Sequence, residues 1–344
     1  MRITRETLLK IARDTSAERV RVNRRIVCVY LTGSVLYEEP LLGGTGDIDL
    51  FIIHDSQPSA EREVVRLSDE IHLDIAHLSQ DVFLHPRQLR THPWISPFIV
   101  SHPLVYHDTQ HWFEFTQAAI TSQFNQPDNV VQRGRRLAEA ARRTWMETSA
   151  APRLAPAQVW NFLKSLEDGA NAIAALTGSP LTERRFWLEF PARALTLGRP
   201  ALSEGLLELF TPQPVADEDW LAWQPTWKET LQAAGLAEDC PPHLLPARQP
   251  YYLRAAGKLR EANPAAALWI LLRTWTRAAC LLAALPSSRQ AAVWESGSQQ
   301  PAWLAALQTL GLDEAGFPER LEALDGYLDS VEETLDDYAS QMGV

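Results

Sequence analysis

Hydrophobic and polar residues follow two different periods along the chain, and the period changes near residue 115. Before this point, short apolar runs bounded by turn residues predict β-strands. These predicted strands cover residues 24–33, 47–54, 62–67, 71–79 and 104–106. A helical pattern over residues 4–18 comes first, and the letters SDE predict a hairpin between the third and fourth strands. The first part of the chain is therefore predicted to be a mixed α/β domain.

After residue 115, apolar residues recur at helical spacing, which predicts a bundle of α-helices. The predicted helices cover residues 129–149, 155–178, 182–198, 264–285 and 317–340. The last helix carries an apolar stripe formed by Leu321, Leu324, Leu328, Val331 and Leu335. Prolines cluster between residues 211 and 250, and this stretch is predicted to be a linker. The predicted fold class is α+β, with a small mixed-sheet domain over residues 1–115 and an all-α domain over residues 116–344.

Length and composition limit the classes of protein to consider. A chain of 344 residues favours two domains. The formal net charge of −11 argues against non-specific binding to nucleic acid, which needs a positive surface. There is no run of 18 apolar residues, so we expect no membrane span. The scattered cysteines Cys28, Cys240 and Cys280 favour reduced thiols in a cytoplasmic protein.

Acidic residues interrupt two of the predicted strands. Asp47 and Asp49 are two residues apart, so an extended strand places both side chains on one face, with Cα atoms about 7 Å apart. Asp74 lies between Leu73 and Ile75 in a later strand. If the two strands are neighbours, the three carboxylates form a cluster. Carboxylate oxygens are the ligands that Mg²⁺ prefers, so the sequence predicts a magnesium site.

The dipeptide Gly33-Ser34 follows the first predicted strand. A glycine turn that leads into a helix start presents free backbone N–H groups and the positive end of a helix dipole. The Ser34 hydroxyl can also bond to a phosphate oxygen. Together with the acids, this pair suggests a site for a nucleoside triphosphate.

Simpler interpretations of these residues remain open. Asp47 and Asp49 can flank a turn after Gly46 without binding a metal. Asp74 can lie on the exposed face of its strand, because the surrounding residues also alternate. Ser34 can serve as an ordinary helix N-cap.

The order of these motifs resembles the signature of the nucleotidyltransferase superfamily, which has the DNA polymerase β-like fold. That signature is Gly-Ser, then an acid-x-acid strand, then a third acid on a later strand. The resemblance covers residues 26–78 and is greatest to the minimal and the aminoglycoside nucleotidyltransferases. It implies that Gly33 and Ser34 bind the nucleotide phosphates. It also implies that Asp47, Asp49 and Asp74 are catalytic residues that bind two Mg²⁺ ions, or Mn²⁺ in their place.

Lys164 is a further candidate from the predicted helical domain. It shares one helix face with Asn161, Asp168 and Asn171, opposite an apolar face. In the resembling family, a lysine of the helical domain commonly reaches the triphosphate, which implies nucleotide binding by Lys164. The alternative is a solvent-facing polar stripe.

Two charged stretches of the predicted helical domain have no place in this site. The basic run from Arg133 to Arg143 could meet a triphosphate or a nucleic acid, and the acidic face of the helix over 317–340 could attract a polycation. We interpret each as a solvated helix face.

The function implied by the resemblance is Mg²⁺-dependent transfer of a nucleoside monophosphate from an NTP, with release of pyrophosphate. ATP is the default nucleotide. The acceptor is expected to be a hydroxyl of a small molecule, with an antibiotic as the leading specific expectation. Two alternatives stay open: an enzyme that AMPylates a partner protein, as an antitoxin would, and a catalytically inactive NTP-binding protein.

Overall fold

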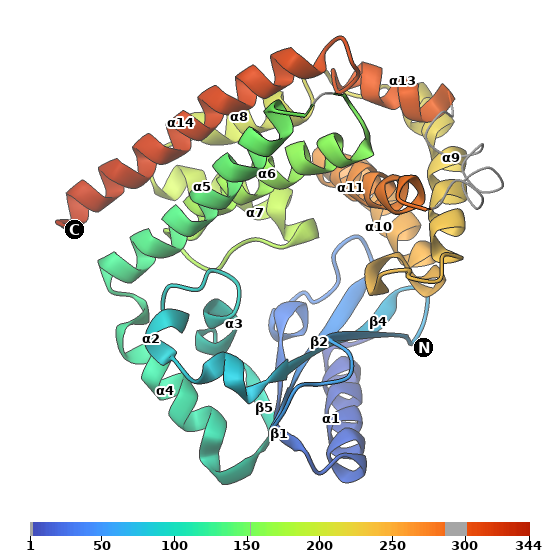
Figure 1. Cartoon of the computed structure of the whole chain (residues 1–344). Helices are drawn as coiled ribbons and strands as arrows, with labels where there is room; N and C mark the ends of the chain where they lie inside the picture. Colours follow the sequence, from blue (N-terminus) through green and yellow to red (C-terminus); the bar gives the residue numbers. More distant parts are fainter. Residues whose placement is uncertain (1–2, 152, 286–300) are drawn as a thin grey trace. The chain divides into compact units, whose positions relative to one another are not determined.

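The computed structural model describes residues 3–151, 153–285 and 301–344. Its internal contacts divide the chain into two compact units, Met1–Val130 and Val131–Val344. All five strands of the sheet belong to the first unit, and the described elements of the second unit are helices (Figure 1). A small mixed sheet combined with many helices is compatible with the α+β class predicted from the sequence. The predicted domain division after residue 115 stays a prediction, and the first compact unit continues to Val130.

The first unit is built on a mixed sheet with the strand order β3-β4-β2-β1-β5. Its strands are β1 (Ile26–Thr32), β2 (Gly46–His54), β3 (Arg62–Arg66), β4 (Ile71–Ser79) and β5 (Leu104–Asp108). Strands β2 and β4 pair in parallel, whereas the other pairs are antiparallel. The predicted hairpin is the β3–β4 pair, and the short fifth strand is present as β5.

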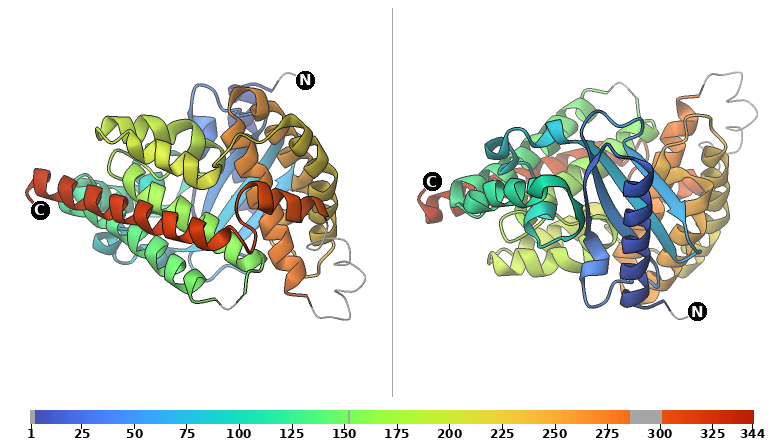
Figure 2. Two further views of the ribbon diagram at one scale, coloured as in Figure 1. Left: turned by 90° about the horizontal axis from the view of Figure 1, so that it is seen from above. Right: turned by 90° about the horizontal axis from the view of Figure 1, so that it is seen from below.

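Helices cover both faces of this sheet. They are α1 (Arg5–Val22), α2 (Pro86–Leu89), α3 (Ser96–Val100) and α4 (Trp112–Phe124), with the short 3-10 helices η1 (Gly33–Leu36), η2 (Gln80–Phe83) and η3 (Thr109–His111). Helix α1 lies across one face, where Ile48, Leu50 and Ile52 of β2 join its core (Figure 2). Helix α4 packs on the opposite face, against a cluster that includes Ile53. The period of two along β2 thus places alternate residues in two cores.

The second unit consists of longer helices. They are α5 (Pro127–Ser149, which crosses the unit boundary), α6 (Pro156–Ala174), α7 (Glu183–Thr196), α8 (Ala201–Phe210), α9 (Asp217–Gly235), α10 (Gln249–Ala262), α11 (Pro264–Ala283), α13 (Pro301–Thr309) and α14 (Phe317–Met342), with the 3-10 turns η4 (Pro242–Leu244) and η5 (Pro246–Arg248). The five helices predicted here from the sequence are all present as α5, α6, α7, α11 and α14. In α14 the predicted stripe is buried from Leu324 to Leu335, as a core-facing stripe requires.

The prediction of a linker between residues 211 and 250 is wrong. Helix α9 occupies the middle of this stretch and contains Pro225 within its length. Three tryptophans at helical spacing, Trp220, Trp223 and Trp227, are buried along one side of it. Their burial outweighs the cost of the proline, because large aromatic side chains gain the most from leaving water.

Among the described residues, α11 is long and apolar enough to cross a membrane. Most of this apolar stretch is buried inside the protein. An apolar helix of this kind is also what the core of a helical unit requires. Its aromatic residues Trp269 and Trp275 are fully buried.

Candidate active site

Strands β2 and β4 bring the three predicted acids to one face of the sheet. Asp49 is the register partner of Asp74, and Asp47 is the partner of His72. Residues paired in register on parallel strands point to the same side, so Asp47, Asp49 and Asp74 share a face. The simpler interpretations are wrong in two respects. Asp47 and Asp49 lie within β2 rather than at a turn, and Asp74 is only 4% exposed.

The burial of β2 explains how it can contain two carboxylates. Asp47 and Asp49 are partly exposed, whereas their neighbours Ile48 and Leu50 point to the opposite face and are fully buried. The apolar side of the strand therefore forms the core with α1, and the acidic side keeps access to solvent. This arrangement avoids the cost of burying two unpaired charges.

Asp74 is held by an arginine that the sequence patterns did not single out. The Nε and Nη2 atoms of Arg62 donate to the two carboxylate oxygens of Asp74, at 2.6 Å and 2.8 Å. Arg62 lies on β3, two residues from Val64, which is the register partner of Asp74. Opposite charges at diagonal positions of a predicted hairpin are the signal that could have indicated this pair.

Gly33 approaches Asp49 so closely that no other residue fits without movement. Its φ of +79° lies in the left-handed region, which favours glycine. A Cβ atom built there would overlap the Asp49 carboxylate. Both the backbone conformation and the close approach therefore require glycine, and the Gly33 backbone lies directly beside one of the candidate metal ligands.

The environment of Ser34 differs from the expected helix start. The element after Gly33 is η1, a single 3-10 turn of four residues. A turn this short does not provide the helix dipole that the sequence suggested. The N-cap of η1 is Thr32 and has no side-chain capping bond, so Ser34 is not its N-cap. Instead, the Ser34 hydroxyl donates to the backbone carbonyl of Asp47 at 3.2 Å, which links the Gly-Ser turn to β2.

The donor set is suitable for a hard divalent cation, although the ligands are not gathered in a preformed site. Within the described residues, there is no group of three or more His, Cys, Asp or Glu side chains arranged to hold a metal ion. Asp47 and Asp49 offer carboxylate oxygens at the edge of solvent, which suits Mg²⁺. Asp74 can join them through the lone pairs that its bonds to Arg62 leave, or by exchanging Arg62 for the metal.

Lys164 lies in the second unit and has acidic partners of its own. On α6, its Nζ is 2.7 Å from the Asp168 carboxylate and 3.6 Å from that of Glu167. Burial raises the pKa of Asp168, and the charge of Lys164 opposes this effect. Asp168 and Asn171 are buried, so the interpretation of this helix face as solvent-facing is wrong. The proposed role of Lys164 in nucleotide binding stays a prediction.

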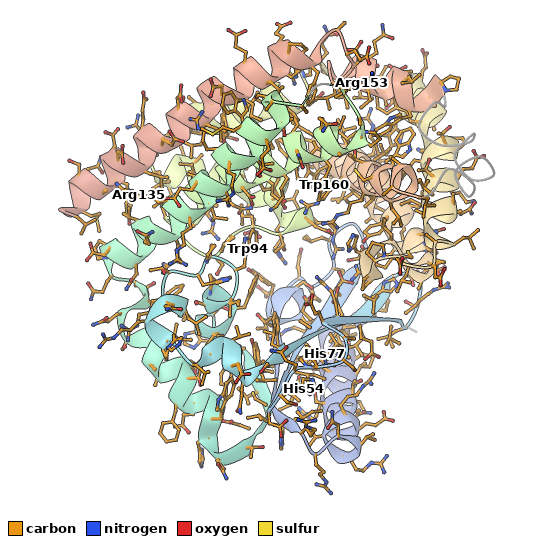
Figure 3. All side chains as sticks on the ribbon, viewed as in Figure 1. His54, His77, Trp94, Arg135, Arg153 and Trp160 are labelled. Carbon is orange, nitrogen blue, oxygen red and sulfur yellow. The ribbon has the colours of Figure 1, made fainter. Side chains whose placement is uncertain are left out.

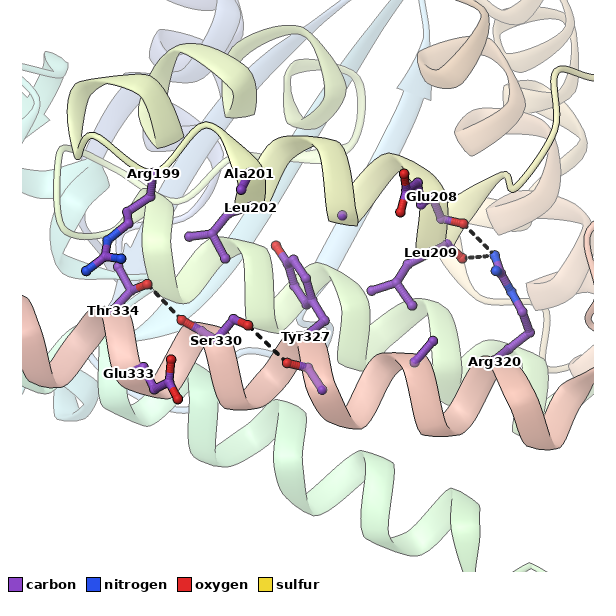
Figure 4. Close-up of a pocket in the computed structure, with 13 residues that line it drawn as sticks. Arg199, Ala201, Leu202, Glu208, Leu209, Arg320, Tyr327, Ser330, Glu333 and Thr334 are labelled. Carbon is purple, nitrogen blue, oxygen red and sulfur yellow. Dashed lines mark hydrogen bonds between the residues drawn. The ribbon is translucent and has the colours of Figure 1, made fainter.

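A cavity of about 470 Å³ lies between α8 and α14 of the second unit (Figure 4). None of the predicted site residues lines it. Tyr327 extends from α14 into the space between the two helices, where its ring lies beside Gly205 of α8. Arg320 at one end donates to the backbone carbonyl of Glu208 at 2.9 Å. Its lining includes the carboxylates of Glu208 and Glu333.

Comparison of the chain with models of known protein families gives no match. Comparison with curated protein sequences gives none either. The functional argument therefore depends on the residues and their geometry.

Proposed function

We propose that this protein is a Mg²⁺-dependent nucleotidyltransferase that moves a nucleoside monophosphate from an NTP, by default ATP, to a hydroxyl of a small molecule. The observation that carries the proposal is the register of β2 and β4. It places Asp49 beside Asp74, on the face that also carries Asp47, with the Gly33 backbone against Asp49. This is the order of motifs that the nucleotidyltransferase signature requires, on a small mixed sheet that a helical unit follows in the chain.

In this proposal, Asp47 and Asp49 hold Mg²⁺, and Asp74 completes the ligand set. When bound, Mg²⁺ supplies positive charge to the phosphates and activates the attacking hydroxyl. The protein groups have separate tasks. Gly33 leaves space for the Asp49 carboxylate beside the turn, and Ser34 fixes the turn to the Asp47 carbonyl. Arg62 orients the Asp74 carboxylate until a metal competes for it.

The proposal is tested by thermal melts with each NTP, with and without Mg²⁺. We expect a Mg²⁺-dependent increase in Tm that is lost in the Asp47→Asn/Asp49→Asn variant. A ligand at about 100 times its Kd adds roughly 2.7 kcal/mol to the free energy of unfolding, which is readily measured. The matched control is Asp14→Asn, which removes an exposed carboxylate from α1 of the same unit. Equal increases in Tm in the wild type and in the Asp47→Asn/Asp49→Asn variant would contradict the proposed metal site.

One observation favours a second candidate, an NTP-binding protein without turnover. Arg62 donates to both oxygens of Asp74, so a positive charge already lies at the acid that the resemblance assigns to the acceptor side. Release of pyrophosphate from the bound NTP, measured over a panel of hydroxylated acceptors and a cell lysate, separates the candidates. Mg²⁺-dependent binding with no pyrophosphate release over the whole panel would favour the inactive protein. A labelled protein band in the lysate would instead favour a protein acceptor.

A further inference from the structure

The side of the sheet that carries the acids continues into a row of aromatic side chains. Phe51 lies two residues after Asp49 on β2, so it points to the same side of the strand as Asp47 and Asp49. All three residues are partly exposed, whereas Ile53, the next residue on this side, is fully buried in the cluster that includes Phe113 of α4. Phe51 therefore lies where the acidic part of β2 meets the core.

The rings of this row are closely packed in the core and more widely spaced at the surface. Tyr30 of β1, the register partner of Phe51, stacks on its ring with 5.0 Å between the centroids. The ring of Phe113 lies 4.9 Å from that of Tyr30, and both residues are buried. Phe98 of α3 stacks on Phe51 at 6.4 Å, towards the wide end of the range for aromatic pairs, and both residues are partly exposed. Phe51 and Phe98 are thus the open end of the row.

Strand β4 places only a small side chain beside Phe51. Ala76, two residues after Asp74, is the register partner of Phe51 on this strand and is itself partly exposed. A methyl group covers little of a neighbouring ring, which is consistent with the partial exposure of Phe51. The aromatic surface formed by Phe51 and Phe98 therefore begins one strand repeat, about 7 Å, from the candidate metal ligand Asp49.

We propose that this aromatic surface binds the base of the nucleotide by stacking, an inference that rests on the proposed function. In that function, Mg²⁺ at Asp47 and Asp49 holds the triphosphate. The ribose separates the base from the phosphates, which lets the base reach a surface further along β2. Every base has a flat π-face, so it can stack on an aromatic ring without a hydrogen bond to its edge. The acids and the aromatic surface then bind the two ends of one ligand.

The test compares ATP with inorganic tripolyphosphate, which has the same phosphate groups and no base. Calorimetric titration of the full chain with Mg²⁺ gives the Kd of each ligand, for the wild type and for Phe51→Leu/Phe98→Leu. Stacking of a base on an aromatic side chain changes Kd by about 5-fold to 150-fold. We expect the Kd of ATP to rise by at least about 5-fold in this variant, with the Kd of tripolyphosphate unchanged. Phe98→Tyr keeps the ring and should keep the wild-type Kd of ATP.

The matched control is Phe115→Leu, which removes a ring that is 71% exposed on α4 of the same unit and should leave both Kd values unchanged. A loss of folded protein in the double variant would weaken both ligands alike, so the comparison of the two ligands corrects for it. An unchanged Kd of ATP, or equal increases for ATP and tripolyphosphate, would overturn the stacking surface and leave the proposed function in place. If the wild type binds neither ligand with Mg²⁺, the proposed function fails, and this inference fails with it.

Discussion

At the scale of single residues, the three carboxylates of the candidate site are held to different extents. Asp74 is buried and bonded through both oxygens to Arg62, whereas Asp47 and Asp49 are partly exposed. The positive charge of a bidentate arginine competes with a metal for the same carboxylate. Arg62 itself is 53% exposed, so its release into water costs less than that of a buried arginine.

We predict that Arg62→Gln lowers the Mg²⁺ concentration needed for half of the ATP-induced Tm shift, because Asp74 becomes available without breaking an ion pair. The same variant should reduce the free energy of unfolding by about 1–3 kcal/mol, since a buried carboxylate loses its partner. Mg²⁺ titrations followed by thermal melts, together with urea unfolding, measure the two effects.

The control for this variant is Arg66→Gln on the same strand. Arg66 pairs with Asp69, and both side chains are largely exposed, so we expect a change of about 0–1 kcal/mol. A Mg²⁺ requirement in Arg62→Gln that equals or exceeds the wild-type value would show that Asp74 is not a metal ligand.

At the scale of elements, two charged helix faces that the sequence suggested were solvated prove to be partners. Arg142 of α5 forms ion pairs with Asp325, Asp329 and Glu332 of α14. Its side chain is only 16% exposed and also lies over the Trp145 ring. Arg135 of α5 pairs with Asp336 of α14. Ion pairs therefore join the basic and acidic stretches within the second unit. The interpretation as solvated faces is wrong for Arg133 and Arg142, which are largely buried, whereas Arg136 and Asp329 are exposed as that interpretation expects.

We predict that Arg142→Ala reduces the free energy of unfolding by about 1–3 kcal/mol, because three carboxylates of α14 lose a shared cation. Urea denaturation at low salt measures the loss. Arg135→Ala is the matched control on the same helix. Its single ion pair is exposed, so its effect should be about 0–1 kcal/mol. Equal losses in the two variants would show that the network adds nothing beyond a surface pair.

At the scale of the whole molecule, stability should depend on pH through two histidines of the sheet. His54 Nε2 lies 2.9 Å from His77 Nδ1, and the two rings are neighbours on β2 and β4 (Figure 3). Burial lowers the pKa of both side chains from the ordinary value of 6.5. The charges around them are those of Glu63 and Arg19 at His77, and of Asp55 and Arg25 at His54.

We predict that the free energy of unfolding falls as the pH decreases through 6.5. Below this pH the unfolded chain binds protons that the native histidines bind only at lower pH, so acid favours unfolding. Above pH 6.5 both states hold neutral histidines, and the full stability is present. Urea denaturation between pH 5.5 and 8 measures the slope, which should be smaller in His77→Gln. The exposed His111→Gln is the control and should keep the wild-type slope.

The sequence by itself determined the local elements and the face on which the acids lie. Periods of two and of 3.6 residues are properties of neighbouring positions, so they predicted β2, β4 and helices such as α14 before any packing was known. The spacing of Asp47 and Asp49 likewise fixed their common side of β2. Their roles in catalysis, and those of Gly33, Ser34, Asp74 and Lys164, stay predictions.

The tertiary structure alone decided which distant residues meet. The bonds of Arg62 to Asp74, the ion pairs of Arg142 and the ion pair of Arg273 with Glu167 join residues from separate elements. Helix α9 formed where prolines had suggested a linker, because burial of its tryptophans depends on the helices packed around it. The energy of such contacts depends on residues that are far apart in the sequence. A pattern of neighbouring positions therefore does not predict them.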